Sequence, residues 1–295
     1  MNQEERRQRR QKDTKSAVIV CVIVVLILLA LAAGGVFLVG RLLPKGGGQN
    51  AGTGGTELPG ESIAATEEVT EQPQTEVQTD PVEEQAAQLV SQMTLEDKIA
   101  QMFVITPNAL TGYASGVTAA GDTTKEAYQS RPVGGIVYMA DNLTDPEQTT
   151  TMLSNMQEIA RERTGLPVFL CVDEEGGSVA RIAGNETFGV TNVGNMSDIG
   201  ASGDVQNAYN AGSTIGSYLA ALGFNVDFAP VADVLTNPDN QVIGQRSFGS
   251  DAQTVAGMVT SELQGLSAAG VYGMVKHFPG HGGTSGDSHD GAVST

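Results

Sequence analysis

The fold is decided by residues 165–177, which read GLPVFLCVDEEGG. A glycine at this position is typical of the end of a helix. The apolar run 168–172 does not alternate with polar residues, as expected for a strand that is covered on both faces of a parallel sheet. The polar residues from Asp173 onward begin where this strand should end. The stretch therefore predicts an α/β fold with a polar loop after the strand.

The same pattern recurs along the chain. Further strand-type stretches are predicted at residues 136–139, 224–228 and 271–275, with a possible one within 99–105. Glycines mark predicted helix ends, and Asp or Thr residues mark predicted helix starts; the ends are Gly165, Gly223 and Gly270, and the starts are Asp80, Thr94, Asp145 and Asp251. Alternating strands and helices predict a parallel sheet flanked by helices.

Periodicity does not choose between a doubly wound sheet and a (β/α)8 barrel. No Gly-x-Gly-x-x-Gly follows any of the predicted strands, which weakens the dinucleotide-binding version. A complete barrel has eight strands and about 250 residues. Because residues 81–295 show four clear strands, we expect an incomplete barrel domain over that range.

The N-terminal part predicts a membrane anchor. Residues 17–40 carry no charge and are long enough to cross a bilayer. Basic residues are concentrated in the tail 1–16, which places that tail in the cytoplasm and the rest outside the cell. A cleavable signal peptide is the alternative, because Ala30-Leu31-Ala32 resembles a cleavage site, but the apolar run is longer than a signal core. Residues 41–80 are rich in Gly, Thr, Glu, Gln and Pro, and predict a disordered linker.

Composition excludes several classes of protein. The chain has 16 Lys and Arg against 34 Asp and Glu, a net charge of −18. This balance argues against nucleic acid as a partner, since no basic surface would neutralise phosphates. Of the two cysteines, Cys21 lies inside the apolar run, out of reach of Cys171. Neither a disulfide scaffold nor a zinc ribbon is therefore expected.

All three histidines of the chain follow the last predicted strand, at His277, His281 and His289. Together with Asp287 they could supply zinc ligands, although the spacing lacks the i, i+4 pair of a helical His motif. In an acid/base site, Asp287 would accept a hydrogen bond from one ring nitrogen of His289, and the other nitrogen would move a proton. The structural alternative is that these histidines only stabilise turns in a Gly-rich loop, but their clustering favours a catalytic or metal-binding role.

A second candidate site follows the strand at 168–172. Asp173 and Arg181 present an acceptor and a fork of donors, which suits sugar hydroxyls. The structural alternative is an ion pair between these two residues that holds the loop. Arg246 adds a further cation in the loop 244–249. Asp227 and Asp233 are strand-end carboxylates for which a structural role is at least as suitable as a catalytic one.

These motifs together resemble glycoside hydrolase family 3. They are DEEGGSVAR at 173–181, FAPVAD at 228–233, RSFG at 246–249, KHFPGHG at 276–282 and DSH at 287–289. The match runs from about Leu95 to His289. Within the family, the chain is similar to the NagZ-like β-N-acetylglucosaminidases, because the family's β-glucosidases lack the Asp-x-His pair.

The resemblance implies a (β/α)8 barrel and a retaining mechanism without a metal or cofactor. His289 would be the general acid/base and Asp287 its orienting partner. The terminal N-acetylglucosamine would be held by Asp173, Arg181, Arg246, Lys276 and His277. The family's nucleophile is an Asp on a later strand, and the chain stops soon after His289, so we expect a truncated product or partial sequence in which no other Asp takes that role.

The leading hypothesis is a membrane-anchored, outward-facing enzyme that removes terminal N-acetylglucosamine from peptidoglycan fragments or related glycans. The absence of Trp fits a pocket for one terminal sugar. Alternatives are a non-catalytic tethered sugar-binding protein, a β-glucosidase or phosphorylase of the same family, and last a metal hydrolase.

Overall fold

The computed structural model describes residues 80–114 and 116–293. The expected basic tail 1–16, the anchor 17–40 and all but the last residue of the linker 41–80 lie outside the described residues. Within the described ranges, no helix combines the length and the apolar composition that crossing a bilayer requires.

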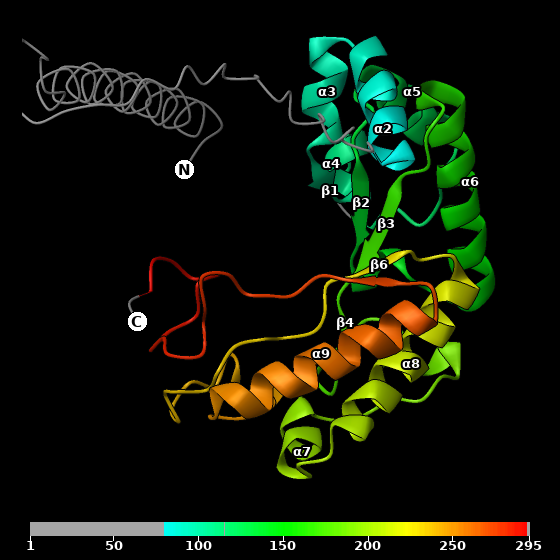
Figure 1. Ribbon diagram of the computed structural model, residues 1–295. Coiled ribbons are helices and arrows are strands. Elements are labelled where there is room, and N and C mark those ends of the chain that lie inside the picture. The colour runs from blue at the N-terminus through cyan, green and yellow to red at the C-terminus, as the bar shows by residue number, and fades with distance from the viewer. Residues whose placement is uncertain (1–79, 115, 294–295) are drawn as a thin grey trace, which may run out of the picture. The chain divides into compact units, whose positions relative to one another are not determined.

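Helices and strands alternate along most of this part of the chain (Figure 1). The α-helices are α2 (Pro81–Gln92), α3 (Leu95–Gln101), α4 (Pro107–Thr111), α5 (Asp122–Ser130), α6 (Pro146–Thr164), α7 (Met196–Ala201), α8 (Val205–Leu222) and α9 (Ala252–Ala268). The strands are β1 (Val104–Ile105), β2 (Gly135–Tyr138), β3 (Phe169–Val172), β4 (Glu174–Gly176), β5 (Val179–Ala180), β6 (Val226–Asp227) and β7 (Tyr272–Gly273), with short 3-10 helices η1 (Ala140–Asn142), η2 (Glu186–Phe188) and η3 (Gly244–Arg246).

The main sheet is parallel, as the sequence predicts. Its strand order is β1-β2-β3-β6-β7, and every neighbouring pair is parallel. The possible strand within 99–105 exists, but only at its end, because Leu95–Gln101 forms α3. β4 and β5 form a separate antiparallel hairpin directly after β3.

The predicted helix boundaries follow local capping chemistry. The side chains of the four predicted start residues each accept a hydrogen bond from a backbone N–H of the first turn; these are Asp80, Thr94, Asp145 and Asp251. Gly165 and Gly223 end α6 and α8 with φ of 73° and 103°, a left-handed conformation that glycine adopts without strain. α9 stops one residue earlier than predicted, with Ala269 as its C-cap and Gly270 at positive φ.

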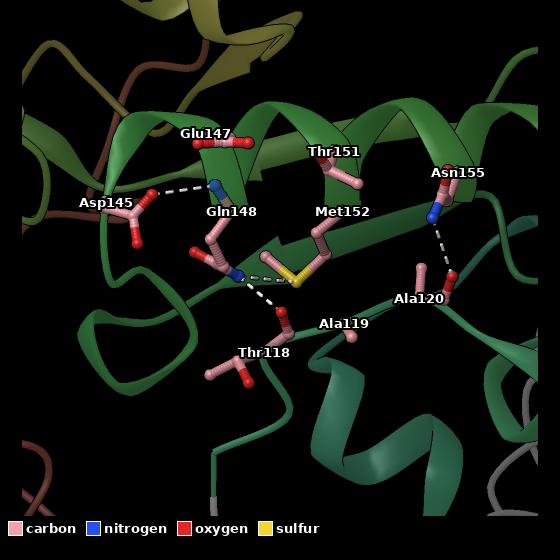
Figure 2. A pocket seen from close by; sticks show the side chains of 9 residues that line it. All are labelled: Thr118, Ala119, Ala120, Asp145, Glu147, Gln148, Thr151, Met152 and Asn155. Carbon is pink, nitrogen blue, oxygen red and sulfur yellow. Dashed lines mark hydrogen bonds between the residues drawn. The ribbon is translucent and has the colours of Figure 1, made fainter.

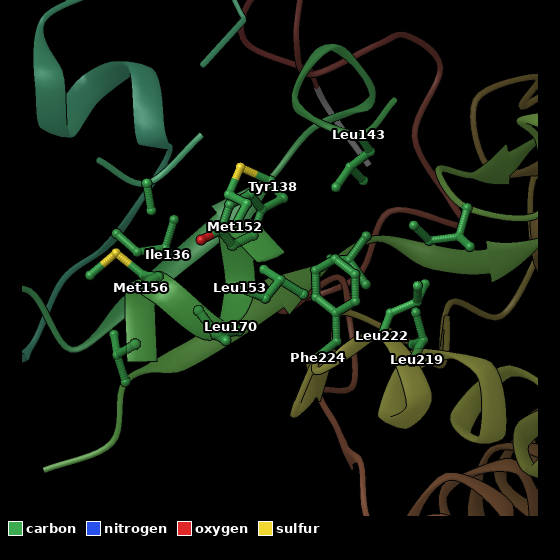
Figure 3. Close-up of a cluster of buried hydrophobic side chains, with 14 of the residues drawn as sticks. Ile136, Tyr138, Leu143, Met152, Leu153, Met156, Leu170, Leu219, Leu222 and Phe224 are labelled. Atoms are coloured by element: carbon green, nitrogen blue, oxygen red, sulfur yellow. The ribbon is translucent and has the colours of Figure 1, made fainter. Parts of the chain in front are cut away.

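The main core lies between the sheet and helices α6 and α8 (Figure 3). Tyr138 of β2 and Phe224, just before β6, meet edge to face with ring centroids 5.9 Å apart, a favoured aromatic geometry. Around them pack Ile136 and Leu170 from the sheet, Met152, Leu153 and Met156 from α6, and Leu219 and Leu222 from α8. This packing fixes the carboxyl ends of β2, β3 and β6 relative to one another.

The prediction of strands buried on both faces is correct for β2, holds in β3 except at the exposed Phe169, and is wrong at the edges of the sheet. All four residues of β2 are buried, whereas Tyr272 of β7 is 72% exposed and Val104 of β1 is also exposed. β1 and β7 are the two edge strands of this sheet. Because each has a neighbour on one side only, less of its side-chain surface is covered.

Helices α8 and α9 lie side by side in close contact (Figure 1). Glycines allow the approach, since a Cβ on Gly212 would lie 2.2 Å from the carbonyl oxygen of Glu262. This packing buries Glu262 almost completely inside the helix layer.

Candidate active site

Asp173 and Lys276 meet at the carboxyl end of the sheet. Asp173 follows β3, and Lys276 lies three residues after β7, two strands away. Lys276 Nζ donates to Asp173 Oδ1 at 2.7 Å and forms an ion pair with Glu175 Oε1 at 2.5 Å. The loops after parallel strands converge at this edge, where such folds place their sites. Two of the predicted sugar-binding residues are therefore in direct contact.

Glu175 is shared by two cations. Arg246, at the end of η3, donates Nε to Glu175 Oε2 and Nη2 to Glu175 Oε1, both at 2.8 Å. The Glu175 side chain is only 2% exposed. A buried carboxylate is stable only when it is paired, and the planar guanidinium pairs with it through two parallel bonds. We call Asp173, Glu175, Arg246 and Lys276 the ion-pair network.

His277 extends this network to Asp233. Its Nδ1 lies 2.5 Å from Asp233 Oδ2, and its Nε2 lies 3.1 Å from Arg246 Nη2. Since a guanidinium only donates, Nε2 must accept and Nδ1 must carry the proton donated to Asp233. Both nitrogens of the neutral ring are occupied, so His277 is arranged to hold its neighbours rather than to move a proton.

Asp233 is a fully buried carboxylate with two partners. Besides the His277 ring, it accepts the backbone N–H of His281 on its other oxygen. Burial by itself raises the pKa of this carboxyl, but the hydrogen bonds from His277 and His281 outweigh burial and hold the pKa below its usual value. Asp233 is therefore an ionised anchor that joins two segments of the chain.

Arg181 does not join the ion-pair network. It follows β5, and its Nε is buried without a hydrogen-bond partner in the described part of the chain. The alternative of an Asp173–Arg181 ion pair is wrong, because Asp173 pairs with Lys276 instead. A buried guanidinium nitrogen without a partner is unusual.

The predicted acid/base pair is formed, but at the surface. His289 Nδ1 lies 2.6 Å from Asp287 Oδ1, which also accepts the backbone N–H of His289. These bonds lower the pKa of Asp287, the backbone bond most. The His289 side chain is 83% exposed, and neither residue bonds to the ion-pair network within the described ranges.

The three histidines thus have different surroundings, although the rings of His277 and His281 lie edge to face with their centroids 6.2 Å apart. His281 is buried, with hydroxyl groups of Thr284 and Ser288 on its two ring nitrogens. In residues 80–114 and 116–293, no three or more His, Cys, Asp or Glu side chains are arranged to hold a metal ion. The histidine cluster of the sequence is therefore divided among three hydrogen-bonding roles.

Three further carboxyls are buried, one each on β4, β6 and α9: Glu174, Asp227 and Glu262. Glu174 accepts bonds from the backbone of Ile182 and Ala183 and from the Tyr218 hydroxyl. Asp227 keeps one oxygen, and Glu262 both, without a hydrogen-bond partner in the described residues. Burial raises the pKa of Glu262 to about 8 and that of Asp227 well above its usual value. Both are expected to be neutral acids in the core.

A pocket of about 390 Å³ lies beside the N-terminus of α6, away from the predicted site residues (Figure 2). Its amide side chains tie the loop 118–120 to this helix: Gln148 donates to the Thr118 carbonyl at 2.6 Å, and Asn155 donates to the Ala120 carbonyl at 3.3 Å. Gln148 and Asn155 therefore hold the loop 118–120 against α6, and this structural role accounts for the polar groups that line the pocket.

Sequence reasoning missed the roles of Glu175 and Glu262. It considered a structural role for Asp233 and a turn-stabilising role for His281, but it did not identify their partners. Glu175 stood inside a quoted motif, and its place after a buried strand was a signal that it could share the site with Asp173. The side chains that contact these residues come from loops far away in sequence, which no local pattern reveals.

Comparison with known proteins shows the family to which this chain belongs. A model of the glycosyl hydrolase family 3 N terminal domain matches residues 94–295, more than half of the chain. Beta-hexosaminidase A of Pseudoalteromonas piscicida is 41% identical over 164 residues, which cover 54% of this chain and 27% of that protein. Beta-hexosaminidase LpqI of Mycobacterium tuberculosis is 38% identical over 199 residues, covering 68% of this chain and 46% of that protein.

A solved structure agrees with these relatives. The glycoside hydrolase family 3 beta-N-acetylglucosaminidase from Paenibacillus sp. str. FPU-7 superposes with a TM-score of 0.60 at 41% sequence identity, covering 67% of this chain and 35% of that one. The chain spans less than half the length of each of these three proteins.

Proposed function

The chain belongs to glycosyl hydrolase family 3, and on that premise we propose that it provides the sugar-binding and acid/base residues of an exo-acting β-N-acetylglucosaminidase. The observation that carries the proposal is the ion-pair network at the carboxyl end of the sheet. The proposed sugar, N-acetylglucosamine, is taken from the names of the relatives, beta-hexosaminidase and beta-N-acetylglucosaminidase. Peptidoglycan fragments or related glycans are the proposed source of that sugar.

In this proposal the ion-pair network binds the hydroxyl groups of one terminal sugar. Asp173 accepts hydroxyl protons, and the cations Lys276 and Arg246 donate to hydroxyl oxygens. Glu175 neutralises both cations and fixes their direction before the sugar arrives, which reduces the ordering cost of binding. The partly buried Arg181 is proposed to donate to the sugar as well, through the end of its guanidinium group. His277 holds Arg246 in place through its fixed ring.

His289 is the proposed general acid/base. Asp287 holds Nδ1, which leaves Nε2 to protonate the leaving oxygen and then to remove a proton from water in the second half of a retaining reaction. The nucleophile, an Asp on a later strand by family resemblance, lies outside the residues that the structure describes. The five parallel strands are proposed as part of a (β/α)8 barrel.

We place this domain outside the cell on a membrane anchor. The support is the sequence: residues 17–40 are uncharged and follow a basic tail. If the anchor functions, the protein should sediment with membranes and be accessible to protease in intact cells. Removal of residues 1–40 should release the enzyme into the soluble fraction, and soluble full-length protein would contradict the placement.

The function is tested with protein expressed from the full coding region, assayed on a chromogenic β-N-acetylglucosaminide. Asp287→Ala should lower kcat at least 100-fold, the usual size of general acid/base catalysis. Asp290→Ala, an exposed aspartate in the same loop, is the matched control and should stay within twofold of the wild type.

Other outcomes identify the alternatives. Equal turnover of a β-glucoside would indicate a β-glucosidase, and turnover that requires phosphate would indicate a phosphorylase. Binding of N-acetylglucosamine without turnover of any substrate would contradict the enzyme and leave a sugar-binding protein.

A further inference from the structure

Asp233 connects the sugar-binding side to the acid/base side of the candidate site. One of its carboxylate oxygens bonds the His277 ring, which contacts Arg246 of the ion-pair network. The other accepts the backbone N–H of His281 at 2.5 Å. The two histidines are therefore held by one buried, ionised group. The segment that begins at His281 leads directly to Asp287 and His289.

His281 in turn contacts two residues of the loop that follows it, Thr284 and Ser288. Its Nδ1 lies 2.7 Å from Thr284 Oγ1, and its Nε2 lies 3.1 Å from Ser288 Oγ. The backbone carbonyl of His281 accepts a bond from Asn240 at 2.7 Å, so the ring starts from a fixed position. We call residues 284–290 the acid/base loop. Ser288 stands between Asp287 and His289, the two residues of the proposed dyad.

The bonds of His281 do not depend on where its proton lies. Both partners are hydroxyl groups, which can donate or accept, so the ring keeps two partners in either neutral tautomer and when protonated. With both nitrogens occupied, His281 is suited to holding the loop rather than to exchanging a proton with a substrate.

We propose that Asp233 and His281 are positioning residues, which hold the acid/base loop at a fixed place relative to the ion-pair network. The hydrogen-bonded series runs from Arg246 through His277, Asp233 and His281 to Ser288. The role of the loop in catalysis rests on the proposed function. The hydrogen bonds of the series can be tested without measuring turnover.

The test removes only the last hydroxyl of the series, with Ser288→Ala in the protein from the full coding region. Ser285→Ala is the matched control, because Ser285 is an exposed serine of the same loop without a hydrogen bond in the described structure. Ser288→Thr keeps the hydroxyl and serves as the conservative variant. Three quantities are measured: amide hydrogen exchange of residues 284–290, the Kd for N-acetylglucosamine, and kcat.

The expected results distinguish an effect on the acid/base loop from an effect on sugar binding. Ser288→Ala should speed exchange in residues 284–290 and lower kcat, each by about fivefold, the size of one hydrogen bond. Its Kd for N-acetylglucosamine should stay within twofold, since the ion-pair network is untouched. Ser288→Thr should restore the wild-type values, and Ser285→Ala should not change them. Asp233→Asn, which affects both sides, should speed loop exchange and weaken sugar binding together.

Two results would overturn the proposal. One is equal exchange in Ser288→Ala and Ser285→Ala, which would mean that the His281 contact does not hold the loop. The other is a loss of sugar affinity in Ser288→Ala as large as its loss of kcat, which would indicate general damage. If the wild type neither binds nor hydrolyses the sugar, the proposed function fails, while the exchange comparison still decides whether His281 holds the loop.

Discussion

The buried carboxyl of Glu262 gives the sharpest prediction about stability. It is a buried residue of α9, and neither of its oxygens has a hydrogen-bond partner within the described residues. Burial is the main reason that its pKa rises to about 8, and the negative charge of Glu175 adds to the rise. The substitution Glu262→Gln replaces this group with one of nearly the same shape that is neutral at every pH.

The sign of the effect follows from proton binding. Glu262 titrates near 4.5 in the unfolded chain and near 8 in the folded protein. Between these values the folded protein holds a proton that the unfolded chain has lost, so the free energy of unfolding falls as the pH rises. Each pH unit corresponds to about 1.4 kcal/mol. At pH 7 the ionisable carboxyl therefore lowers the free energy of unfolding by about 3 kcal/mol. The Gln variant has no such loss.

The assay is denaturant unfolding followed by circular dichroism, for both proteins at several pH values from 4.5 to 8. The difference in unfolding free energy, variant minus wild type, should be near zero at pH 4.5 and grow to about 3 kcal/mol at pH 7. Carboxyls that do not interact with Glu262 cancel in this difference. Glu158→Gln, an exposed position on α6, should give a flat line. A difference for Glu262→Gln that does not change with pH would refute the reasoning.

Three further changes have defined outcomes. Gly212→Ala should lower the melting temperature, because the added Cβ would lie 2.2 Å from a carbonyl oxygen of α9, whereas Gly257→Ala meets its nearest atom at 3.6 Å and should be neutral or stabilising. Lys276→Met should lower the free energy of unfolding by about 2 kcal/mol, the size of a hydrogen bond to a charged group, since Asp173 and Glu175 lose this cation while Arg246 still pairs with Glu175; an unchanged denaturation midpoint would contradict this. Asp233, whose pKa is lowered, should stabilise the protein above pH 3.8, and its advantage over Asp233→Asn should shrink as the pH falls below that value.

Much of the fold could be predicted because its signals are local. The side chains of Asp145 and Asp251 cap the helices that they were expected to start, and Gly165 and Gly223 end the helices that they were expected to end. α5 gave no such signal: its N-cap is Gly121, which offers no side-chain bond. The exposure of the edge strands depends on neighbours in space, which the strand sequences do not contain.

The sequence was enough to select several residues of the candidate site, but not to predict which of them pair with one another. Asp173, Arg246, Lys276 and His277 were all selected, and the structure brings them together. The partner they share, Glu175, could not be distinguished from a solvated acid, because its cations are far along the chain. Glu262 was hidden for a related reason, since a glutamate in a helix is ordinarily exposed, whereas this one is buried where α9 packs closely against Gly212 of α8.

The order of strands in the sheet, β1-β2-β3-β6-β7, is also their order along the chain. During synthesis, each new strand of the sheet can therefore pair with one that has already left the ribosome, so the sheet can grow outward from its first strand. The ion-pair network takes Asp173 from the segment after β3 and Lys276 from the segment after β7. A nascent chain would thus pair β1, β2, β3 and β6 before Lys276 has emerged, and the contact between Asp173 and Lys276 would form only once the last strand of the sheet is in place.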